Sequence, residues 1–456
     1  MKILSSLSLS LAVMLSAGCG NTLKSDYHAP KVDYPANWYQ DEASDDQVPF
    51  DWQAFNDPLL ARWLRQVMES NNEVAIAILR LYRARLDAER VGITSAPGLN
   101  GALNADGKTP LDNGAGWMKG SSATLNTSYE LDLWGKIARQ RDAAEWASRA
   151  TEQDLRSAKL TLLAEASNNY WHLGYVNQQI AVLQQSISYA RATLRLAEAR
   201  YRAGSASALD VVEAQQSLLT QENRLTALQR VRLQTLNQQA VLLGSAPGQP
   251  VVEPSTLPKG AMPQVKANIP ASVLWRRPDI SAQEWRVREA LANVDIRRSE
   301  YYPTFTLTGS LGTSSHSLLT FLQNPLGSVG GSLTLPFLEW RQRGIEVKIA
   351  RNDYQRRLLE FKQALYKAMS SIEDALSLRK QLLAQEVRLR EALALARRSE
   401  RLNEARYRQG AVRISFWLDA QEKRRQSELL LDENRFHQLQ NLAKIYLEFG
   451  GSPTFP

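Results

Sequence analysis

The chain has 456 residues, of which 44% are apolar, and its 55 basic and 47 acidic residues give a net charge of +8. This length suffices for two or three ordinary domains or one large repeated domain, and the apolar fraction argues against intrinsic disorder. The two signs of charge are interspersed along helical stretches. The composition therefore favours solvated helix faces and speaks against nucleic acid as a partner.

The N-terminus has the pattern of an export signal. Met1 and Lys2 form a short positive region, and residues 3–15 form an apolar run that is too short to span a bilayer. Cys19 is the only cysteine, so it cannot form an internal disulfide. The stretch "LSAGC" that ends at Cys19 is similar to the lipobox of bacterial lipoproteins, which implies a signal peptide over residues 1–18 and a lipid on Cys19. An ordinary secretory signal is the alternative.

One phrase, Glu-Ala-Arg-Tyr-Arg-x-Gly, occurs at residues 198–204 and again 206 residues later at 404–410. The same offset aligns further identical residues along the chain. They include Ala214 with Ala420, Leu225 with Leu431, and Gly244 with Gly450. This self-similarity predicts a tandem duplication of one unit of about 200 residues.

Both units are expected to contain the same elements in the same order. Helices are expected to begin at Asp57-Pro58 and at Pro278-Asp279, because proline suits the first helical position and aspartate the positive helix end. The expected divisions are an N-terminal tether 19–55, a first repeat 56–247 with β-hairpin 94–132 and α-hairpin 134–243, a Pro-rich crossing 248–275, and a second repeat 276–453 with β-hairpin 302–338 and α-hairpin 340–449.

The long helices are the clearest pattern. Residues 345–409 contain no proline and no glycine, and residues 136–203 contain only Gly174. At 1.5 Å per residue, such a helix is about 100 Å long. A heptad-spaced apolar seam follows the first of them: Ile180, Leu183, Ile187, Ala190, Leu194, Ala197 and Tyr201. We therefore expect two long helical hairpins, with tip turns at Gly204 and Gly410.

Four strand-like segments alternate apolar and polar residues. The clearest have Phe305, Leu307 and Leu311 on one face, and Val329, Leu333, Leu335 and Phe337 on one face. This alternation fits a soluble sandwich, and it also fits membrane strands with lipid on one side and water on the other. A membrane barrel needs at least eight strands, so closure would require two chains or, for a wider lumen, three.

Several phrases resemble one family in their order along the chain. They are "FNDPLLARWL", "SYELDLWGK", "LWRRPDI", "YYPTFTLTGSLG" and the two Tyr-Arg-x-Gly turns. Together with the signal, they resemble the TolC-like outer-membrane efflux proteins, in particular their lipoprotein branch.

The resemblance implies a mainly α fold with a membrane β-barrel portion. It implies a homotrimer whose twelve-stranded barrel lies in the outer membrane of a Gram-negative bacterium and continues as a periplasmic α-helical barrel. It also implies that the chain is a passive exit channel of a tripartite pump, with a periplasmic adaptor (membrane fusion) protein and an inner-membrane transporter as partners.

The resemblance also implies a gate at the periplasmic tips. An acidic residue at the place of Asp419 lies in the constriction of the family, and Glu213 is its counterpart at the 206-residue offset. Phe416 and Trp417 precede Asp419 and are further gate candidates. Threefold symmetry would turn each carboxylate into a ring that repels anions and attracts cations. A solvated helix-face acid is the alternative.

The tip turns are the expected docking place of the adaptor. Tyr201 and Tyr407 are expected to pack beneath the turns, while Arg202 and Arg408, together with Arg200 and Arg406, are expected to be exposed beside them. Gly204 and Gly410 are needed for the backbone conformation of the turns.

Catalysis has little support in the sequence. The four histidines are scattered, none has a metal-ligand spacing, and there is no glycine-rich phosphate loop. We expect neither an enzyme nor a cofactor. Two alternatives to a channel stay open, a lipid-anchored coiled-coil envelope scaffold without channel activity and, with less support, an envelope hydrolase.

Overall fold

A computed structural model describes residues 23–32, 52–109, 117–263, 271–315 and 325–451. The chain forms two compact units, each built from three stretches. The first comprises residues 1–32, 79–153 and 281–363, and the second comprises residues 33–78, 154–280 and 364–456. The predicted signal peptide 1–18 and Cys19 lie outside the described residues, as does most of the predicted tether.

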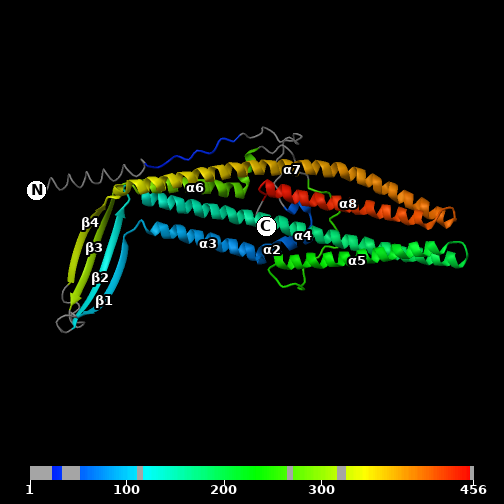
Figure 1. Cartoon of the computed structure of the whole chain (residues 1–456), viewed down its shortest axis with the longest axis horizontal. Helices are drawn as coiled ribbons and strands as arrows, with labels where there is room; N and C mark the ends of the chain where they lie inside the picture. The colour runs from blue at the N-terminus through cyan, green and yellow to red at the C-terminus, as the bar shows by residue number, and fades with distance from the viewer. Residues whose placement is uncertain (1–22, 33–51, 110–116, 264–270, 316–324, 452–456) are drawn as a thin grey trace. The chain divides into compact units, whose positions relative to one another are not determined.

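Apart from one additional helix at the start of the first repeat, helices and strands follow one another as expected from the sequence (Figure 1). The elements are α2 (Pro58–Ser70), α3 (Asn72–Ile93), β1 (Gly98–Lys108), β2 (Met118–Leu131), α4 (Lys136–Arg202), α5 (Ala208–Leu242), α6 (Pro278–Ser299), β3 (Thr304–Ser315), β4 (Pro325–Thr334), α7 (Trp340–Arg408) and α8 (Ile414–Glu448), with 3-10 turns at Trp52–Phe55, Ala271–Arg276 and Pro336–Glu339. None of these helices has an apolar stretch long enough to cross a membrane.

The duplication is visible in the element bounds. Shifting α3 by 206 residues gives the bounds of α6, and shifting α5 gives the bounds of α8. The two β-hairpins also share one register, because Gly98 pairs with Ser128 in the first and Thr304 with Thr334 in the second. These equivalences confirm the tandem repeat.

The first repeat begins with two helices where one was expected. Asp57 caps α2 as predicted, since its Oδ1 accepts hydrogen bonds from the Leu59 and Leu60 amides at 3.0 and 3.1 Å. The counterpart of α6, however, is α3 and not α2. Asn71 separates α2 from α3 because its Oδ1 accepts from the amides of Glu73 and Val74, and its amide group donates to the Leu242 carbonyl at 2.8 Å.

Helix α2 is buried in the core of the second unit. Trp63 is fully buried and donates from its indole nitrogen to the Ala166 carbonyl of α4 at 2.9 Å. Just before α2, the Phe55 ring lies 4.9 Å from Trp171 and 5.5 Å from Tyr446 of α8. This additional helix therefore joins α4 and α8 through a common aromatic core.

The crossing between the repeats packs on the helices of the second unit. Gly174, the one glycine of α4, makes room for it, because a Cβ there would lie 2.9 Å from the Thr256 carbonyl oxygen. Arg232 of α5 pairs with Glu253 at 2.7 Å, and Arg435 of α8 donates to the Pro258 carbonyl at 2.8 Å.

The phrase "LWRRPDI" has a structural role, as predicted. Pro278 begins α6, and the Arg277 side chain pairs with Asp279 at 2.8 Å and with Glu448 at the end of α8. Ser371 of α7 donates to the other oxygen of Glu448. Since Arg277 and Glu448 are largely buried, this network links the start of α6 and the end of α8 to the middle of α7.

The strands form one antiparallel sheet in the first unit, in the order β1-β2-β3-β4 (Figure 1). β1 pairs with β2 along its whole length despite its weak sequence pattern. β4 ends at Thr334, so the predicted strand extension to Leu335 and Phe337 is wrong. Pro336 starts a 3-10 turn there, since proline lacks the amide that the ladder needs.

A part of the predicted tether is fixed to the first unit. Ser25 donates from its amide and its hydroxyl to the Asp295 carboxylate of α6, both at 2.7 Å, and Arg298 donates to the Ser25 hydroxyl at 2.9 Å. The Arg288 guanidinium lies 4.3 Å from the centre of the Tyr27 ring. These contacts attach residues 23–32 to α6 and satisfy the buried Asp295 carboxylate.

All four helices of the two α-hairpins end in glycines with a positive φ, at Gly204, Gly244, Gly410 and Gly450. In each case the amide after the glycine donates to the carbonyl five residues before it, such as Ser205 to Arg200 at 2.8 Å. This is the hydrogen bond of a Schellman cap, and it explains why glycine stands at these places in both repeats.

We predict that Gly450→Ala lowers the thermal unfolding midpoint more than Gly204→Ala does. Both substitutions place a side chain at positive φ, which costs about 1–2 kcal/mol. A Cβ at Gly450 would also lie 2.8 Å from the Arg276 carbonyl oxygen, whereas a Cβ at Gly204 would meet nothing within 4 Å. Circular dichroism during heating checks this, and equal shifts would contradict the role of the Gly450 contact.

Candidate functional site: the sheet faces and the hairpin tips

The register of the sheet separates two chemically different faces. Directly paired residues share a face, and in all four strands one face carries the odd-numbered residues. This face includes Leu99, Leu103, Leu125, Tyr129, Leu131, Phe305, Leu307, Leu311, Val329 and Leu333. The even-numbered face carries mostly Asn, Ser and Thr, for example in the pairs Asn100 with Asn126 and Ser310 with Ser328. The predicted alternation is therefore confirmed.

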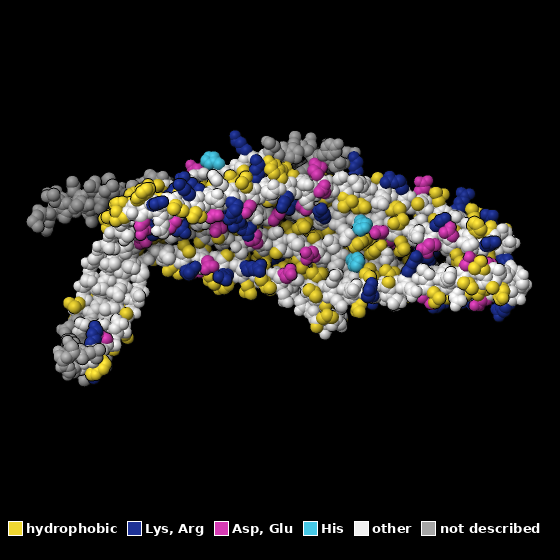
Figure 2. All heavy atoms as spheres, viewed as in Figure 1, with side chains coloured by type: hydrophobic (Ala, Val, Ile, Leu, Met, Phe, Trp, Pro, Cys, Tyr) yellow, Lys and Arg dark blue, Asp and Glu magenta, His cyan; other side chains and the backbone are white. Residues whose placement is uncertain are grey.

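No described part of the chain covers the apolar face. Val329 is 95% exposed, and Leu99, Leu103 and Leu311 of the same face are also largely exposed. The side of the sheet that is visible in Figure 2 carries mostly side chains that are neither charged nor hydrophobic. The ion pair of Lys108 with Asp106, at 3.6 Å, belongs to the even-numbered face. An exposed apolar surface of this extent is typical of a face that contacts a membrane or another protein.

At the tips, in the second unit, the two α-hairpins pack against each other. A buried cluster contains Tyr407, Ile414 and Trp417 from the second hairpin and Ala197 and Ala214 from the first. The rings of Tyr407 and Trp417 lie 5.6 Å apart. Large side chains of one hairpin thus fill the space above small side chains of the other.

The two tip tyrosines differ, although the sequence predicted the same place for both. Tyr407 is 1% exposed and packs beneath its turn as expected, whereas Tyr201 is 51% exposed. The prediction for Tyr201 is wrong because the aromatic residues of the buried tip cluster, Tyr407 and Trp417, both come from the second hairpin. The rest of the predicted seam holds, since Leu183, Ile187, Ala190 and Ala197 are buried.

Arg200 binds Tyr407 and is not free beside the turn. Its guanidinium lies 4.8 Å from the centre of the Tyr407 ring and donates to the Tyr407 carbonyl. Burial raises the pKa of the Tyr407 phenol, the Asp210 carboxylate adds to this rise, and Arg200 opposes it. Tyr407 therefore stays neutral, and Arg200 ties the end of α4 to the end of α7.

The gate candidates lie in different environments. The Asp419 side chain is 63% exposed and lies 2.8 Å from the Lys423 ammonium, one turn further along α8. Phe416 is exposed, Glu213 is half-buried, and Trp417 is buried in the tip cluster. The chain therefore presents Asp419 and Phe416 outward, and Trp417 supports the tip from within.

The expected docking residues surround the turns. Arg202 is exposed, and Arg408 is exposed while pairing with Glu404 at 2.8 Å within α7. Gly204 and Gly410 have φ values of +73° and +77°. The turns thus have the predicted backbone conformation with cationic side chains at the surface.

An ionic network further from the tips was not predicted. Arg424 lies 2.7 Å from both Glu400 and Glu428, and Arg397 lies 3.0 Å from Glu428. The first hairpin has an equivalent of the pair of Arg397 with Glu428, because Arg191 lies 2.8 Å from Glu222. The pair of Arg424 with Glu428 lies within α8, and the other pairs connect the two helices of a hairpin. The repeat offset could have indicated the two pairs that correspond to each other.

Two arginines of this region lie close to one carboxylate. Arg224 of α5 pairs with Glu422 of α8 at 2.8 Å, and the buried Arg425 pairs with the same carboxylate. Burial and the neighbouring Arg224 lower the pKa of Arg425 to about 10. Glu422 therefore joins the two return helices through Arg224, while its pair with Arg425 lies within α8.

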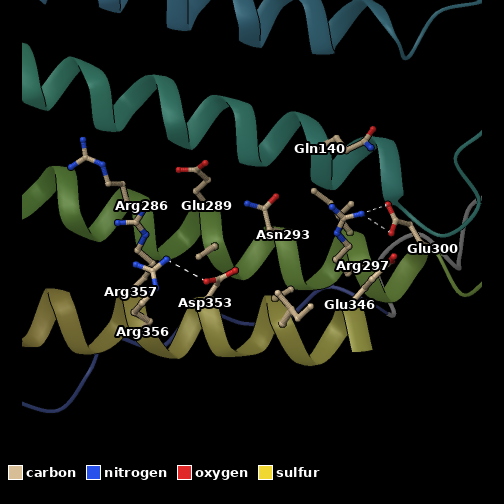
Figure 3. A pocket seen from close by; sticks show the side chains of 14 residues that line it. Gln140, Arg286, Glu289, Asn293, Arg297, Glu300, Glu346, Asp353, Arg356 and Arg357 are labelled. Atoms are coloured by element: carbon tan, nitrogen blue, oxygen red, sulfur yellow. Dashed lines mark hydrogen bonds and ion pairs between the residues drawn. The ribbon is translucent and has the colours of Figure 1, made fainter. Parts of the chain in front are cut away.

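A cavity of about 730 Å³ lies in the first unit between α4, α6 and α7 (Figure 3). Its charged lining residues are Arg286, Arg297, Arg356, Arg357, Glu289, Glu300, Glu346 and Asp353. Burial raises the pKa of Glu289, and Arg357 and Arg286 partly offset this effect. Since both signs of charge are equally represented, the cavity has no preference for one sign of ligand.

The described histidines lie apart and bind local groups. His172 Nδ1 lies 3.0 Å from the Thr235 hydroxyl, and burial lowers its pKa. His28 lies near the Asp26 carbonyl and His437 near Gln440. In the described parts of the chain, no group of three or more His, Cys, Asp and Glu residues could hold a metal ion. His316 lies outside the described residues.

Comparison with known proteins places this architecture in one family. The model of the outer membrane efflux protein family matches residues 63–245 and again residues 269–451, and the starting residues of the two matches differ by 206. Together the matches cover most of the chain and repeat the offset seen in its sequence.

Relatives match over nearly the full length. The pyoverdine export outer membrane protein OpmQ of Pseudomonas aeruginosa is 30% identical over 476 residues, with 98% of this chain and 96% of OpmQ covered. The toluene efflux pump outer membrane protein TtgC of Pseudomonas putida is 26% identical over 461 residues, with 98% and 95% covered.

Solved structures share the fold. The outer-membrane channel OprN matches with a TM-score of 0.86 at 23% identity, covering 95% of this chain and 99% of OprN. The open sheet with an exposed apolar face, the paired α-hairpins and these matches lead to one conclusion. The chain belongs to the outer membrane efflux protein family and is an outer-membrane efflux channel.

Proposed function

We propose that the chain assembles as a homotrimer that forms the outer-membrane exit channel of a tripartite efflux pump. Three copies would supply twelve strands to one β-barrel, and their α-hairpins would form a second, helical barrel in the periplasm. A periplasmic adaptor and an inner-membrane transporter would complete the pump, and the transporter would supply the energy. The relatives OpmQ and TtgC are named for different cargoes, which supports selection of the cargo by the transporter and not by the channel.

The observation that carries this proposal is the open sheet. Its edge strands β1 and β4 are each paired on one side only within the described sheet, and its odd-numbered face is apolar and exposed. Unpaired backbone groups cannot face lipid, so a sheet of this kind must close on itself or on other copies. Four strands are too few to close a membrane barrel, and twelve leave a water-filled lumen for the polar face.

The membrane end of the chain is consistent with a lipid on Cys19. Ser25, which is bound to α6, follows Cys19 by six positions, and an extended chain of six residue steps reaches roughly 20 Å. α6 leads directly into β3, the first strand of the second hairpin. A lipid on Cys19 would therefore enter the same membrane as the strands.

The periplasmic end would control opening. In a trimer, Asp419 and Phe416 would form rings at the tips, and Glu213 would form a second carboxylate ring. Arg202 and Arg408 beside the turns would meet the adaptor. Tyr407 and Trp417, which are buried, would position the gate without lining it.

Conductance in planar lipid bilayers separates the channel from its main rival, a coiled-coil scaffold that holds envelope partners without conducting. We expect the purified protein to give discrete conductance steps that the scaffold cannot give. Their complete absence from membranes that contain the inserted protein would favour the scaffold.

We predict that Asp419→Ala raises this conductance at fixed salt, because it removes three carboxylates from the constriction. The pair that Asp419 forms with Lys423 is exposed and contributes only about 0.3–0.5 kcal/mol, so the fold should be unaffected. The matched control is Glu433→Ala, an exposed acid on α8 away from the tip. Equal conductance of Asp419→Ala and the wild type would show that Asp419 is a surface acid.

We predict that Cys19→Ser abolishes labelling of the protein by a fatty acid analogue in living cells. Cys19 is the only cysteine, so no other thiol of the chain could carry the label. Gel fluorescence of the immunoprecipitated protein measures it. A label that persists in the variant would remove Cys19 as the anchor.

A further inference from the structure

The two hairpins contribute different residues to the contact between them at the tip. The first hairpin contributes Arg200, which stacks on Tyr407 of the second hairpin and donates to its carbonyl. The second hairpin contributes Ile414 and Trp417, which pack over Ala197 of the first. One face of the first hairpin thus binds the opposite face of the second.

The 206-residue offset maps this contact onto two residues whose side chains have no partner among the described residues. The counterpart of Arg200 is Arg406, and the counterpart of Tyr407 is Tyr201. Both side chains are exposed, and within the described residues neither takes part in a hydrogen bond, ion pair or ring contact. Arg406 lies on the second hairpin and Tyr201 on the first. Each chain could therefore supply the arginine of such a contact to one neighbouring copy and the tyrosine to the other.

We propose that Arg406 of one copy stacks on Tyr201 of the next copy and donates to its carbonyl. The proposal rests on the homotrimer proposed above and names a pair of residues that joins its copies at the tip. A ring of three chains would then contain six contacts of one type. Three would be the Arg200 contact within a chain, and three would be the Arg406 contact between chains.

The backbone at Tyr201 is suited to this role. Gly204 and Gly410 end the two long helices with the same Schellman hydrogen bonds, so the Tyr201 carbonyl lies in the same type of helix end as the Tyr407 carbonyl. A guanidinium at a helix C-terminus also interacts favourably with the partial negative charge there. Arg406 can therefore make at Tyr201 both contacts that Arg200 makes at Tyr407.

The contact between copies would be weaker than the contact within a chain. Ala208 replaces Ile414, and Val211 replaces Trp417 in the first hairpin, so less apolar surface would be buried. The ion pair of Arg224 with Glu422 is also without a counterpart, because the offset gives Leu430 and Gln216. The tip would therefore open between chains, while the two hairpins of each chain stay together.

Chemical cross-linking tests the pair directly. The double variant Arg406→Cys with Tyr201→Cys, treated with a short bismaleimide, should give covalent dimers and trimers in denaturing gels. The reference is the variant Arg200→Cys with Tyr407→Cys, which should cross-link within one chain and stay at the monomer mass. The reference also establishes that the reagent spans this type of contact.

The outcomes separate the pair from the assembly. If the double variant has the mass of three chains but gives no cross-link between copies, while the reference pair reacts, the proposed pair is wrong and the trimer stands. If the double variant and the wild type both have the mass of one chain, the trimer itself fails. Cross-links between copies establish the pair.

Conductance gives a second readout that does not depend on a reagent. Arg406→Ala should raise the conductance several-fold, because the weaker of the two contacts loses its only charged group. The matched control is Arg398→Ala, an exposed arginine two turns earlier on α7, which should leave the conductance unchanged. Equal conductance of Arg406→Ala and Arg398→Ala would overturn the role of the pair in closing the tip.

Discussion

The pairing of β2 with β3 is the contact on which the rest of the structure depends. It joins the last strand of the first repeat to the first strand of the second, with Leu125 opposite Leu311 and Tyr129 opposite Leu307. This junction places the apolar side chains of both hairpins on one face. It also leaves β1 and β4 as edges, and each edge needs a further strand that the described part of the chain does not supply. The duplicated chain thus pairs its two β-hairpins with each other, while the edge strands β1 and β4 need partner strands from other copies.

The helical hairpins also make one contact within the chain and leave its counterpart to a neighbouring copy. Within the chain, the larger residues of the second hairpin fill the space above the alanines of the first, and Arg200 fixes the end of α7 through Tyr407. The two hairpins are repeats of one unit, but the second has Ile414 and Trp417 where the first has Ala208 and Val211. In the proposed trimer, the contact within a chain would therefore be stronger than its counterpart between chains. The contacts between chains would be the places at which the tip opens.

Much of this architecture could be predicted from the sequence because it rests on periodicity. The 206-residue offset, the alternation along the strands and the absence of proline from the long helices indicated the repeat, the sheet faces and the α-hairpins. The predictions failed where tertiary packing decided between equivalent residues. Tyr201 and Tyr407 have the same local sequence, yet only Tyr407 is buried, because the partners that cover it come from the other hairpin.

Two further features depended on contacts between distant segments. The break at Asn71 arises from hydrogen bonds to the following helix and to the Leu242 carbonyl, which lies 171 residues away in the sequence. The attachment of Ser25 to the buried Asp295 carboxylate joins residues 270 positions apart. No local pattern marks either contact. Asp419 lies beside the tip turn, as its position after Gly410 predicted. Its partner Lys423 follows it by four residues, a spacing that brings two side chains together on a helix and is readable from the sequence.

The central claim is that one chain cannot close the barrel and that three chains do. The most direct test is the mass of the purified mature protein, corrected for bound detergent, measured by light scattering. The account predicts the mass of three chains, which supplies the strands for an open barrel and a partner for every sheet edge. A stable, folded protein with the mass of one chain would contradict it, because its four strands would have no means of closing in a membrane.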